Sequence, residues 1–441
     1  MTLIANPQLN ALIKPGYSLA EIRAISSFLE NMGTLTFASL PSGLFPAAAL
    51  GSESSYTGYS YVWVRDNIHI AHAHYRTGRT DIAVRNLRAL MTYFIKHRKR
   101  FLDIIDGDVD PNIPMNRPQI RFDGNSLEEV KEKWAHAQND ALGYFLWLFS
   151  KLVNEKALDP SAQELNMLAL FPRYFEAIHY WQDEDSGHWE EGRKVSASSI
   201  GVVVAGLTEY RKLLSNAGSI RDHHGTLIAV EIIEPLIERG HVALEKILPS
   251  ECIQPDPLKH RRYDAALLFL IYPLQIVEGQ IADRILTDVI AHLQGEVGVR
   301  RYLGDSYWAP DYKKKLSPAE RTADVSDDLS SRNRLLSAVG QEAQWCIFDP
   351  CLSCIFGLKF KLTRLPEYLA KQTEYLNRSL RQITSAHQTT LPAFRCPELY
   401  YLEASCYVPN DHVPLLWTQA NLMLAVKLMK ETASRDDGHR P

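Results

Sequence analysis

The stretch AQNDALGYFLWLFSKLVN, residues 137–154, indicates the fold of this chain. Apolar side chains recur in it every three or four residues, which is the period of an α-helix that turns one face to a core. Strand-like alternation is scarce elsewhere, so the sequence predicts an all-α protein. The same helical period returns in residues 18–32, 66–77, 81–98, 162–181, 196–214, 225–239, 263–272, 281–293, 341–358, 365–386 and 412–430.

Helices and loops alternate over the whole length, and no low-complexity linker divides the chain. This pattern predicts one domain of stacked helix pairs over residues 1–432, followed by a polar, disordered tail at 433–441. Two connections, 103–125 and 300–333, are long and mix proline, glycine, charged and aromatic residues. Long ordered loops in a compact domain are usually functional, so we expect these two to contribute to a site.

The charge balance argues against a nucleic-acid partner. The formal net charge is −4, and the basic run at 96–100 ends a predicted helix, where cations are favoured. Residues 1–7 lack the basic and apolar regions of a signal peptide, and no apolar run approaches the roughly 20 residues that span a membrane. The sequence therefore predicts a cytosolic protein with no membrane partner, and its oligomeric state is left open.

The cysteines and histidines do not form a recognisable metal or redox motif. Cys351 and Cys354 have the spacing of half a zinc or redox site, but they lie in an apolar helical run without a second such pair. We expect them to be buried thiols. His69, His72 and His74 do not share one helix face. No Gly-rich phosphate loop is present, so the sequence predicts no metal and no cofactor.

Residues 185–199, DSGHWEEGRKVSASS, contain the first candidate for chemistry. Glu190 and Glu191 follow Trp189 in a loop that leads into a predicted helix. A carboxyl packed on an indole loses solvation, which raises its pKa and keeps it protonated near neutral pH. The alternative is a surface turn with exposed glutamates, and this segment alone does not decide between them.

Further clusters of aromatic and polar residues stand where other predicted helices begin. Arginine and aspartate offer donors and acceptors to vicinal hydroxyls, and tryptophan offers a flat apolar face to a sugar ring. Loops of this kind at one end of a helical domain would form a carbohydrate pocket. The clusters are 61–67 (YVWVRDN), 133–141 (KWAHAQNDA), 299–308 (VRRYLGDSYW), 396–401 (CPELYY) and 414–420 (PLLWTQA).

Together these clusters resemble glycoside hydrolase family 15, the glucoamylases, and the related amino-terminal domain of the phosphorylase kinase α and β subunits. The resemblance rests on short motifs that follow one another in family order from residue 63 to residue 417, so it covers most of the chain. It implies an (α/α)6 toroid. The motifs are WVRD at 63–66, WxxxQxD at 134–140, WEE at 189–191, RY at 301–302, PELYY at 397–401 and PLLW at 414–417.

The resemblance also assigns roles. Glu190 matches the general acid, and Glu398 matches the general base that activates water in an inverting hydrolysis. Inverting carboxyl pairs stand ~6.5–9.5 Å apart, which leaves room for that water. The other residues match the substrate-binding groups: Arg65 and Asp66 for the hydroxyls of the non-reducing-end glucose, Trp134 for a subsite near the acid, Glu191 and Arg301 for the next sugar, and Trp63, Trp189, Tyr302 and Trp417 around them.

The chain also departs from the glucoamylases. Gly187 stands where they often have an aspartate two places before the tryptophan, and the loops at 185–190 and 397–401 look more like those of the kinase subunits. The resemblance therefore implies an exo-acting hydrolase that releases glucose from soluble α-glucans or oligosaccharides. It also admits a non-catalytic sugar-binding or regulatory module, or a related trehalase or dextran-type glucosidase.

Overall fold

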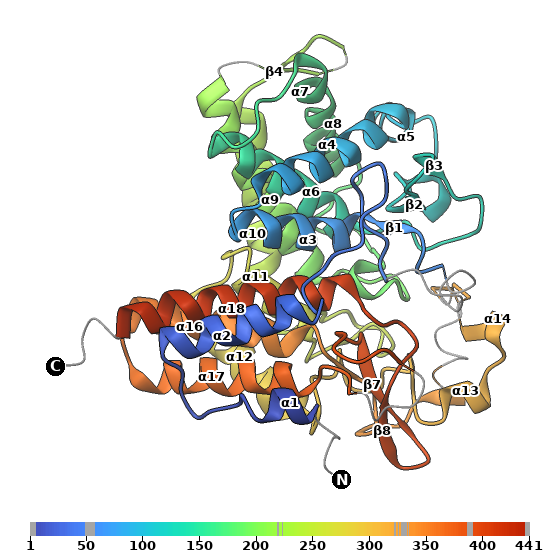
Figure 1. Ribbon diagram of the computed structural model, residues 1–441. Helices are drawn as coiled ribbons and strands as arrows, with labels where there is room; N and C mark the ends of the chain where they lie inside the picture. Colours follow the sequence, from blue (N-terminus) through green and yellow to red (C-terminus); the bar gives the residue numbers. More distant parts are fainter. Residues whose placement is uncertain are drawn as a thin grey trace.

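The computed structural model describes residues 6–436, apart from 49–57, 218–219, 223, 322, 325, 328–332, 334 and 386–390. Helices dominate it (Figure 1). Six inner segments form a ring in which each packs on the next and the last packs on the first. In ring order the inner segments are α3 (Val64–Arg76), α6 (Asn139–Asn154), α9 (Ala197–Ala217), α11 (Leu268–Ile271) with the preceding 3₁₀ turn η3 (Ala265–Leu267), α16 (Phe348–Thr363) and α18 (Leu416–Asp436).

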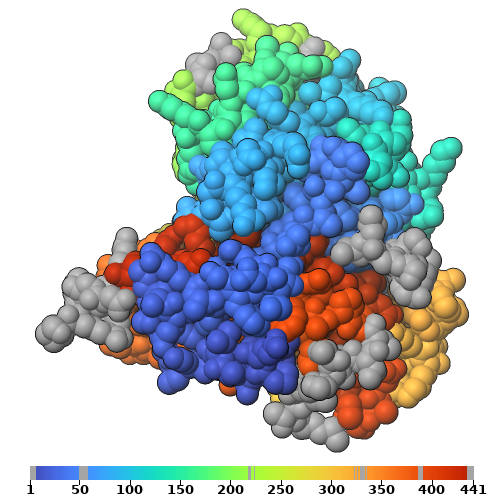
Figure 2. Space-filling model, in the orientation of Figure 1, coloured from blue at the N-terminus to red at the C-terminus, as the bar shows by residue number. Residues whose placement is uncertain are grey.

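An outer helix packs against each inner one, which completes an (α/α)6 toroid and confirms the predicted fold class. Figure 2 shows the N-terminal residues in blue lying against C-terminal residues in red, where α2 covers α18. The outer helices are α4 (Thr80–Lys96) on α3, α8 (Leu170–Ala177) on α6, α10 (Val230–Ile247) on α9, α12 (Gly279–His292) on α11, α17 (Pro366–Arg381) on α16 and α2 (Leu19–Asn31) on α18.

The two layers differ in sequence because they differ in burial. An inner helix is enclosed by two ring neighbours and by its outer partner, so α6 is apolar over most of its surface and 139–150 are all buried. The outer helix α4 has one apolar stripe, as expected for a helix with one face in water. One continuous cluster of buried apolar side chains runs from Leu40 to Trp417 and joins the layers.

Short elements and three small sheets complete the described structure. The strands β1 and β7 matter most, because β1 leads directly into α3 and β7 begins one residue after Glu398. The sheets are β1 (Val62–Trp63), β2 (Arg121–Asp123) and β3 (Glu128–Glu129); β4 (Ile220–Arg221) and β5 (Leu227–Ile228); and β6 (Gln344–Trp345), β7 (Leu399–Glu403) and β8 (Cys406–Pro409), all antiparallel. The short helical elements are α1 (Pro7–Asn10), α5 (Lys99–Ile105), η1 (Pro114–Asn116), α7 (Ala162–Leu168), η2 (Gly187–Trp189), α13 (Tyr312–Lys315) and α14 (Pro318–Arg321).

Several element boundaries differ from the sequence-based expectation. The predicted helix at 162–181 is two helices, α7 and α8, separated at Ala169. The predicted helix at 341–358 begins only at Phe348, because 344–345 pair with β7 and the Gln344 side chain accepts hydrogen bonds from the backbone of Val297 and Gly298. Helix α18 continues to Asp436, four residues past the predicted domain end at 432, and the rest of the predicted tail lies outside the described residues.

Two cysteines are buried as the sequence predicts, and another cysteine is exposed. Cys351 and Cys354 are buried free thiols within α16, as predicted, whereas Cys406 is exposed in β8. Among the described residues, no helix combines the length and apolarity that crossing a bilayer requires.

The helices α6 and α9 approach each other closely at Gly143 and Gly206. A Cβ atom added to Gly206 would lie 2.7 Å from the carbonyl oxygen of Gly143, and one added to Gly143 would lie 2.9 Å from the backbone nitrogen of Val203. Backbone atoms cannot rotate away from such a contact, so the ring closes here only with glycine.

We therefore predict that Gly206→Ala lowers the free energy of unfolding by about 1–3 kcal/mol, although alanine gains about 1 kcal/mol of helix propensity over glycine. Urea unfolding followed by circular dichroism measures the change. Gly16→Ala is the matched control, because a Cβ there has no neighbour within 4 Å. A Gly206→Ala protein as stable as the control variant would contradict the close packing.

Candidate active site

A pocket lies where the amino-terminal ends of the inner helices meet. Its walls come from the segments that precede α3, α6, α9, α16 and α18, from the first residues of α3 and α18, and from residues between 301 and 324, so residues far apart in sequence converge there. The lining residues are Ala47, Tyr59, Trp63, Arg65, Asp66, Trp134, His188, Trp189, Glu190, Glu191, Arg301, Ser306, Tyr307, Arg321, Ala323, Asp324, Trp345, Glu398, His412, Leu415 and Trp417.

The pocket brings together every predicted site residue except Tyr302. Tyr302 is buried beside the pocket, and its hydroxyl, which lies 2.7 Å from each oxygen of Glu191, donates its one proton to that carboxylate. The predicted contact of Tyr302 with the sugar stays a prediction, and in this structure its hydroxyl is occupied by Glu191. Its neighbour Arg301 lines the pocket.

Arg65 connects three of the predicted clusters. Its Nε donates to Asp140 at 2.6 Å, and its Nη2 donates to the Gln138 side chain and to the Gly187 carbonyl. The third nitrogen, Nη1, stands 3.6 Å from Glu190. Protein groups thus occupy most donors of Arg65, and only Nη1 is directed at the pocket. Only this nitrogen of Arg65 is left to bind a sugar hydroxyl, the role that the resemblance implies for Arg65.

Glu190 is held in an unusual backbone conformation. It has φ 59° and ψ 39°, the left-handed region, where a residue other than glycine is uncommon and strained. The residue follows η2 and caps it, and its side chain retains 16% exposure. The surrounding contacts therefore hold the carboxyl at the pocket surface.

Burial raises the pKa of Glu190, and this effect outweighs the lowering by Arg65, by Arg121 and by a hydrogen bond with Trp63. The direction agrees with the expectation from the sequence. The tryptophan that forms a hydrogen bond with this carboxyl is Trp63. Trp189 instead donates from its indole nitrogen to Asp264, at 2.9 Å.

Asp66 is the next carboxyl in the pocket. Burial raises its pKa to about 7, and the nearby charges of Glu190 and Glu398 add to the effect, whereas Arg65 opposes it. Asp66, Glu190 and Glu398 thus interact with one another within the pocket. Since they repel one another when ionised, the pocket favours states in which at least one of them carries a proton.

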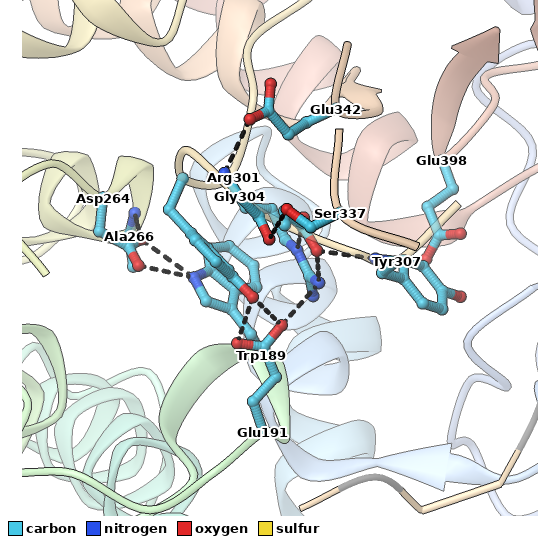
Figure 3. Close-up of polar contacts among 12 residues, drawn as sticks. Trp189, Glu191, Asp264, Ala266, Arg301, Gly304, Tyr307, Ser337, Glu342 and Glu398 are labelled. Carbon is cyan, nitrogen blue, oxygen red and sulfur yellow. Dashed lines mark hydrogen bonds and ion pairs between the residues drawn. The ribbon is translucent and has the colours of Figure 1, made fainter. Parts of the chain in front are cut away.

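Glu191 forms the centre of a buried network beneath the pocket (Figure 3). It accepts hydrogen bonds from Arg301 at 2.9 Å, from Arg261 at 3.1 Å and from Tyr302. These partners lower the pKa of Glu191 despite its burial. A carboxylate occupied by three donors mainly positions its neighbours. Arg301 also donates to Asp305, and within the described residues its Nη1 has no partner, so this nitrogen can bind a ligand hydroxyl.

Glu398 accepts hydrogen bonds on both oxygens. Tyr59 donates to Oε1 at 2.7 Å, and the Tyr307 hydroxyl lies 2.8 Å from that of Tyr59. Because the single Tyr59 proton points to the carboxylate, Tyr307 must be the donor to Tyr59. Asn410 donates to Oε2, and His412 Nδ1 lies 2.8 Å from the same atom. The carboxylate is therefore rigidly oriented.

Several pocket residues were not among the predicted site residues, including Tyr59, Tyr307, Trp345 and His412. Tyr307 lies inside the predicted cluster 299–308 and Tyr59 lies just before the cluster 61–67, so their aromatic character was the available signal. Three pocket indoles, Trp134, Trp345 and Trp417, have buried N–H groups without a partner among the described residues. Buried donors usually find acceptors, so these groups fit a ligand that carries hydroxyls.

Comparison with known families matches residues 23–336 to the model described as glycosyl hydrolases family 15. The uncharacterized lipoprotein YgeQ of Escherichia coli is 28% identical over 205 residues, which cover 42% of this chain and 77% of that protein. A probable phosphorylase b kinase regulatory subunit alpha of Caenorhabditis elegans is 23% identical over 412 residues, or 85% of this chain, and the match spans 31% of the kinase subunit.

A solved glycosidase in complex with glucose has a similar fold. The TM-score is 0.64 at 17% sequence identity, and the match covers 93% of this chain and 97% of the glycosidase. At this identity the likeness concerns the fold alone.

The raised pKa of Asp66 predicts a pH-dependent effect on stability. A carboxyl with an ordinary pKa of about 3.9 in the unfolded chain and about 7 in the folded chain binds its proton more tightly when folded. Its contribution to stability is therefore present at low pH and is lost as the pH rises from about 4 to about 7. We predict that Asp66→Asn is about as stable as the wild type at pH 4 and about 2–4 kcal/mol more stable at pH 8.

Urea unfolding of both proteins at pH 4, 6 and 8 gives this difference directly. The exposed Asp108→Asn variant is the control, and we expect it to differ from the wild type by the same small amount at each pH. A pH-independent difference for Asp66→Asn would show that Asp66 ionises in the folded protein as easily as in the unfolded chain.

Proposed function

Because the chain belongs to glycosyl hydrolases family 15, we propose that it is an inverting, exo-acting hydrolase that releases glucose from soluble α-glucans or oligosaccharides. One observation carries the proposal: Glu190 and Glu398, which come from opposite halves of the sequence, line one pocket. The proposed location remains the cytosol.

Glu190 is the proposed general acid. Its raised pKa keeps it protonated at pH values where an ordinary glutamate is ionised, so it can give its proton to the leaving glycosidic oxygen. Once the proton has left, Arg65 Nη1 at 3.6 Å stabilises the resulting carboxylate. The same arginine thus favours proton release without abolishing the protonated ground state.

Glu398 is the proposed general base. Its hydrogen bonds with Tyr59, Asn410 and His412 hold the carboxylate in one orientation. A water between this carboxylate and the anomeric carbon would lose a proton to Glu398 as it attacks the face of the sugar opposite the leaving group. The configuration at the anomeric carbon would then invert.

The remaining pocket residues suit an uncharged, hydroxyl-rich ligand. Trp63, Trp134 and Trp417 offer flat faces, and unpaired indole N–H groups are available on the latter two. Asp66 accepts hydrogen bonds from hydroxyls or, when protonated, donates one. Arg301 Nη1 and Arg65 Nη1 supply further donors. Burial strengthens these hydrogen bonds because water does not compete with them.

A second candidate function is a sugar-binding regulatory module. The similarity to a phosphorylase b kinase regulatory subunit over 85% of this chain favours it. A related trehalase or dextran-type glucosidase is a third reading, since the pocket contacts do not distinguish the linkage of the substrate. We favour hydrolysis because both carboxyls have the surroundings that acid and base catalysis require.

We predict that the wild-type protein releases β-glucose from maltooligosaccharides, and that Glu190→Gln and Glu398→Gln each reduce kcat by about 10²–10⁴-fold. Proton NMR measures both the rate and the anomer formed. A parallel panel of maltose, isomaltose and trehalose identifies the preferred linkage. Glu176→Gln on the outer helix α8 is the control and should retain full activity.

Absence of hydrolysis of every α-glucoside by the wild-type protein would refute the proposed activity. Calorimetry then tests the regulatory module: we expect that reading to give oligosaccharide binding without turnover, weakened by Trp134→Ala. If the sugars neither bind nor react, the pocket is not a carbohydrate site, and both candidate functions fail.

A further inference from the structure

Two residues of the segment after β8 bind the same oxygen of Glu398. Asn410 Nδ2 and His412 Nδ1 both contact Oε2, and all three groups are buried. Asn410 Nδ2 also lies 3.2 Å from His412 Nδ1. Neither residue belongs to the sequence motifs that indicate the site. The segment 410–412 (NDH) therefore adds two residues to the site that the motifs did not predict.

The contacts determine where the protons lie. A carboxylate oxygen has only lone pairs, so a ring nitrogen 2.8 Å away must carry a proton; His412 therefore donates from Nδ1. Asn410 and His412 together occupy both acceptor positions of Oε2. Oε1 receives Tyr59 alone, which leaves one acceptor position free on that oxygen. A water can be bound and deprotonated only there.

The other nitrogen of the His412 ring is available for a second proton. The ring stacks on Tyr59 with centroids 3.5 Å apart and planes 14° apart, and Trp308 meets it edge-on. His412 lines the pocket, and Nε2 has no hydrogen-bond partner among the described residues. A proton from the pocket can therefore reach Nε2 while Nδ1 stays bonded to Glu398.

We propose that His412 is a positioning residue for Glu398: its neutral ring occupies Oε2 and directs the water to Oε1, and its protonation at Nε2 switches the base off at acid pH. This inference rests on the proposed hydrolytic function. It adds a pH-sensing partner that is hydrogen-bonded directly to the base, in a pocket that also holds the titrating carboxyl of Asp66.

The effect of His412 on Glu398 as a base depends on the charge of the His412 ring. A neutral imidazole donates a hydrogen bond without adding a net charge, whereas an imidazolium stabilises the carboxylate anion and weakens it as a base. The titratable and charged groups around the ring are Glu398, Tyr59 and, through Tyr59, Tyr307; the adjacent Asp411 is paired with Lys313. Burial and the charge of Glu398 raise the pKa values of both tyrosines well above the ordinary range, so they remain neutral donors.

The pH dependence of kcat/KM on maltotriose tests the proposal with two variants. His412→Asn keeps an N–H donor near the position of Nδ1 but cannot titrate. We expect it to keep kcat/KM within about threefold of the wild type at the optimum, while the acid limb of the profile moves at least one pH unit lower. His412→Ala loses the donor, and we expect kcat to fall about ten- to hundredfold with little change in KM.

His292→Asn is the matched control, because His292 also stacks on a tyrosine, Tyr263, but is exposed and outside the pocket. We expect it to leave the profile unchanged. An acid limb that is identical in His412→Asn and the wild type would overturn the proposed switch.

Nitrogen-15 NMR of histidine-labelled protein tests the same coupling without any activity. We expect the His412 ring to carry its proton on Nδ1, and the pH at which it titrates to fall in Glu398→Gln, which removes the neighbouring charge. A ring protonated only on Nε2, or a titration unaffected by Glu398→Gln, would overturn the inference. A wild-type protein that hydrolyses no α-glucoside would instead refute the proposed function, and the NMR result would still decide the coupling.

Discussion

The buried guanidinium of Arg65 is the contact on which the arrangement of the site depends. It joins the start of α3 to Asp140 at the start of α6, to Gln138, to the Gly187 carbonyl before α9, and to Glu190. If this buried cation lost its carboxylate partner Asp140, its charge would be left uncompensated, which is strongly destabilising. The loop that presents Glu190 in a left-handed conformation is therefore held by a group from a different hairpin of the toroid.

The two proposed catalytic carboxyls have contrasting surroundings. Glu190 lies beside cations, and its pKa is nevertheless raised because the burial effect is larger. Glu398 is surrounded by uncharged donors from Tyr59 and Asn410 and by the His412 ring. Uncharged donors orient a carboxylate while leaving it more basic than an arginine would. This difference suits an acid on one side of a sugar and a base on the other.

Local patterns predicted an all-α domain of stacked helix pairs and aromatic-polar clusters at helix starts, whereas the (α/α)6 toroid and the pairing of Glu398 with Glu190 came from the resemblance to glycoside hydrolase family 15. Helical periodicity identifies the inner and outer helices, and a tryptophan beside an acid or an arginine identifies a helix start that faces a ligand. The hydrogen-bond partners were not predictable in this way. Tyr59, Asn410 and His412 acquire their role only when the β7–β8 hairpin returns to the segment before β1. Likewise, Arg301 and Tyr302 belong to one motif, but only Arg301 lines the pocket, because the Tyr302 hydroxyl is bonded to Glu191.

The separation of the two carboxyls around a bound sugar tests the central claim most directly. We would measure it in a crystal structure of Glu190→Gln with maltotriose. The account predicts that the non-reducing-end glucose lies between residue 190 and Glu398, with the two groups about 6.5–9.5 Å apart and a water on Oε1 of Glu398. A sugar bound away from this pair, or a separation near 5 Å without room for a water, would contradict it.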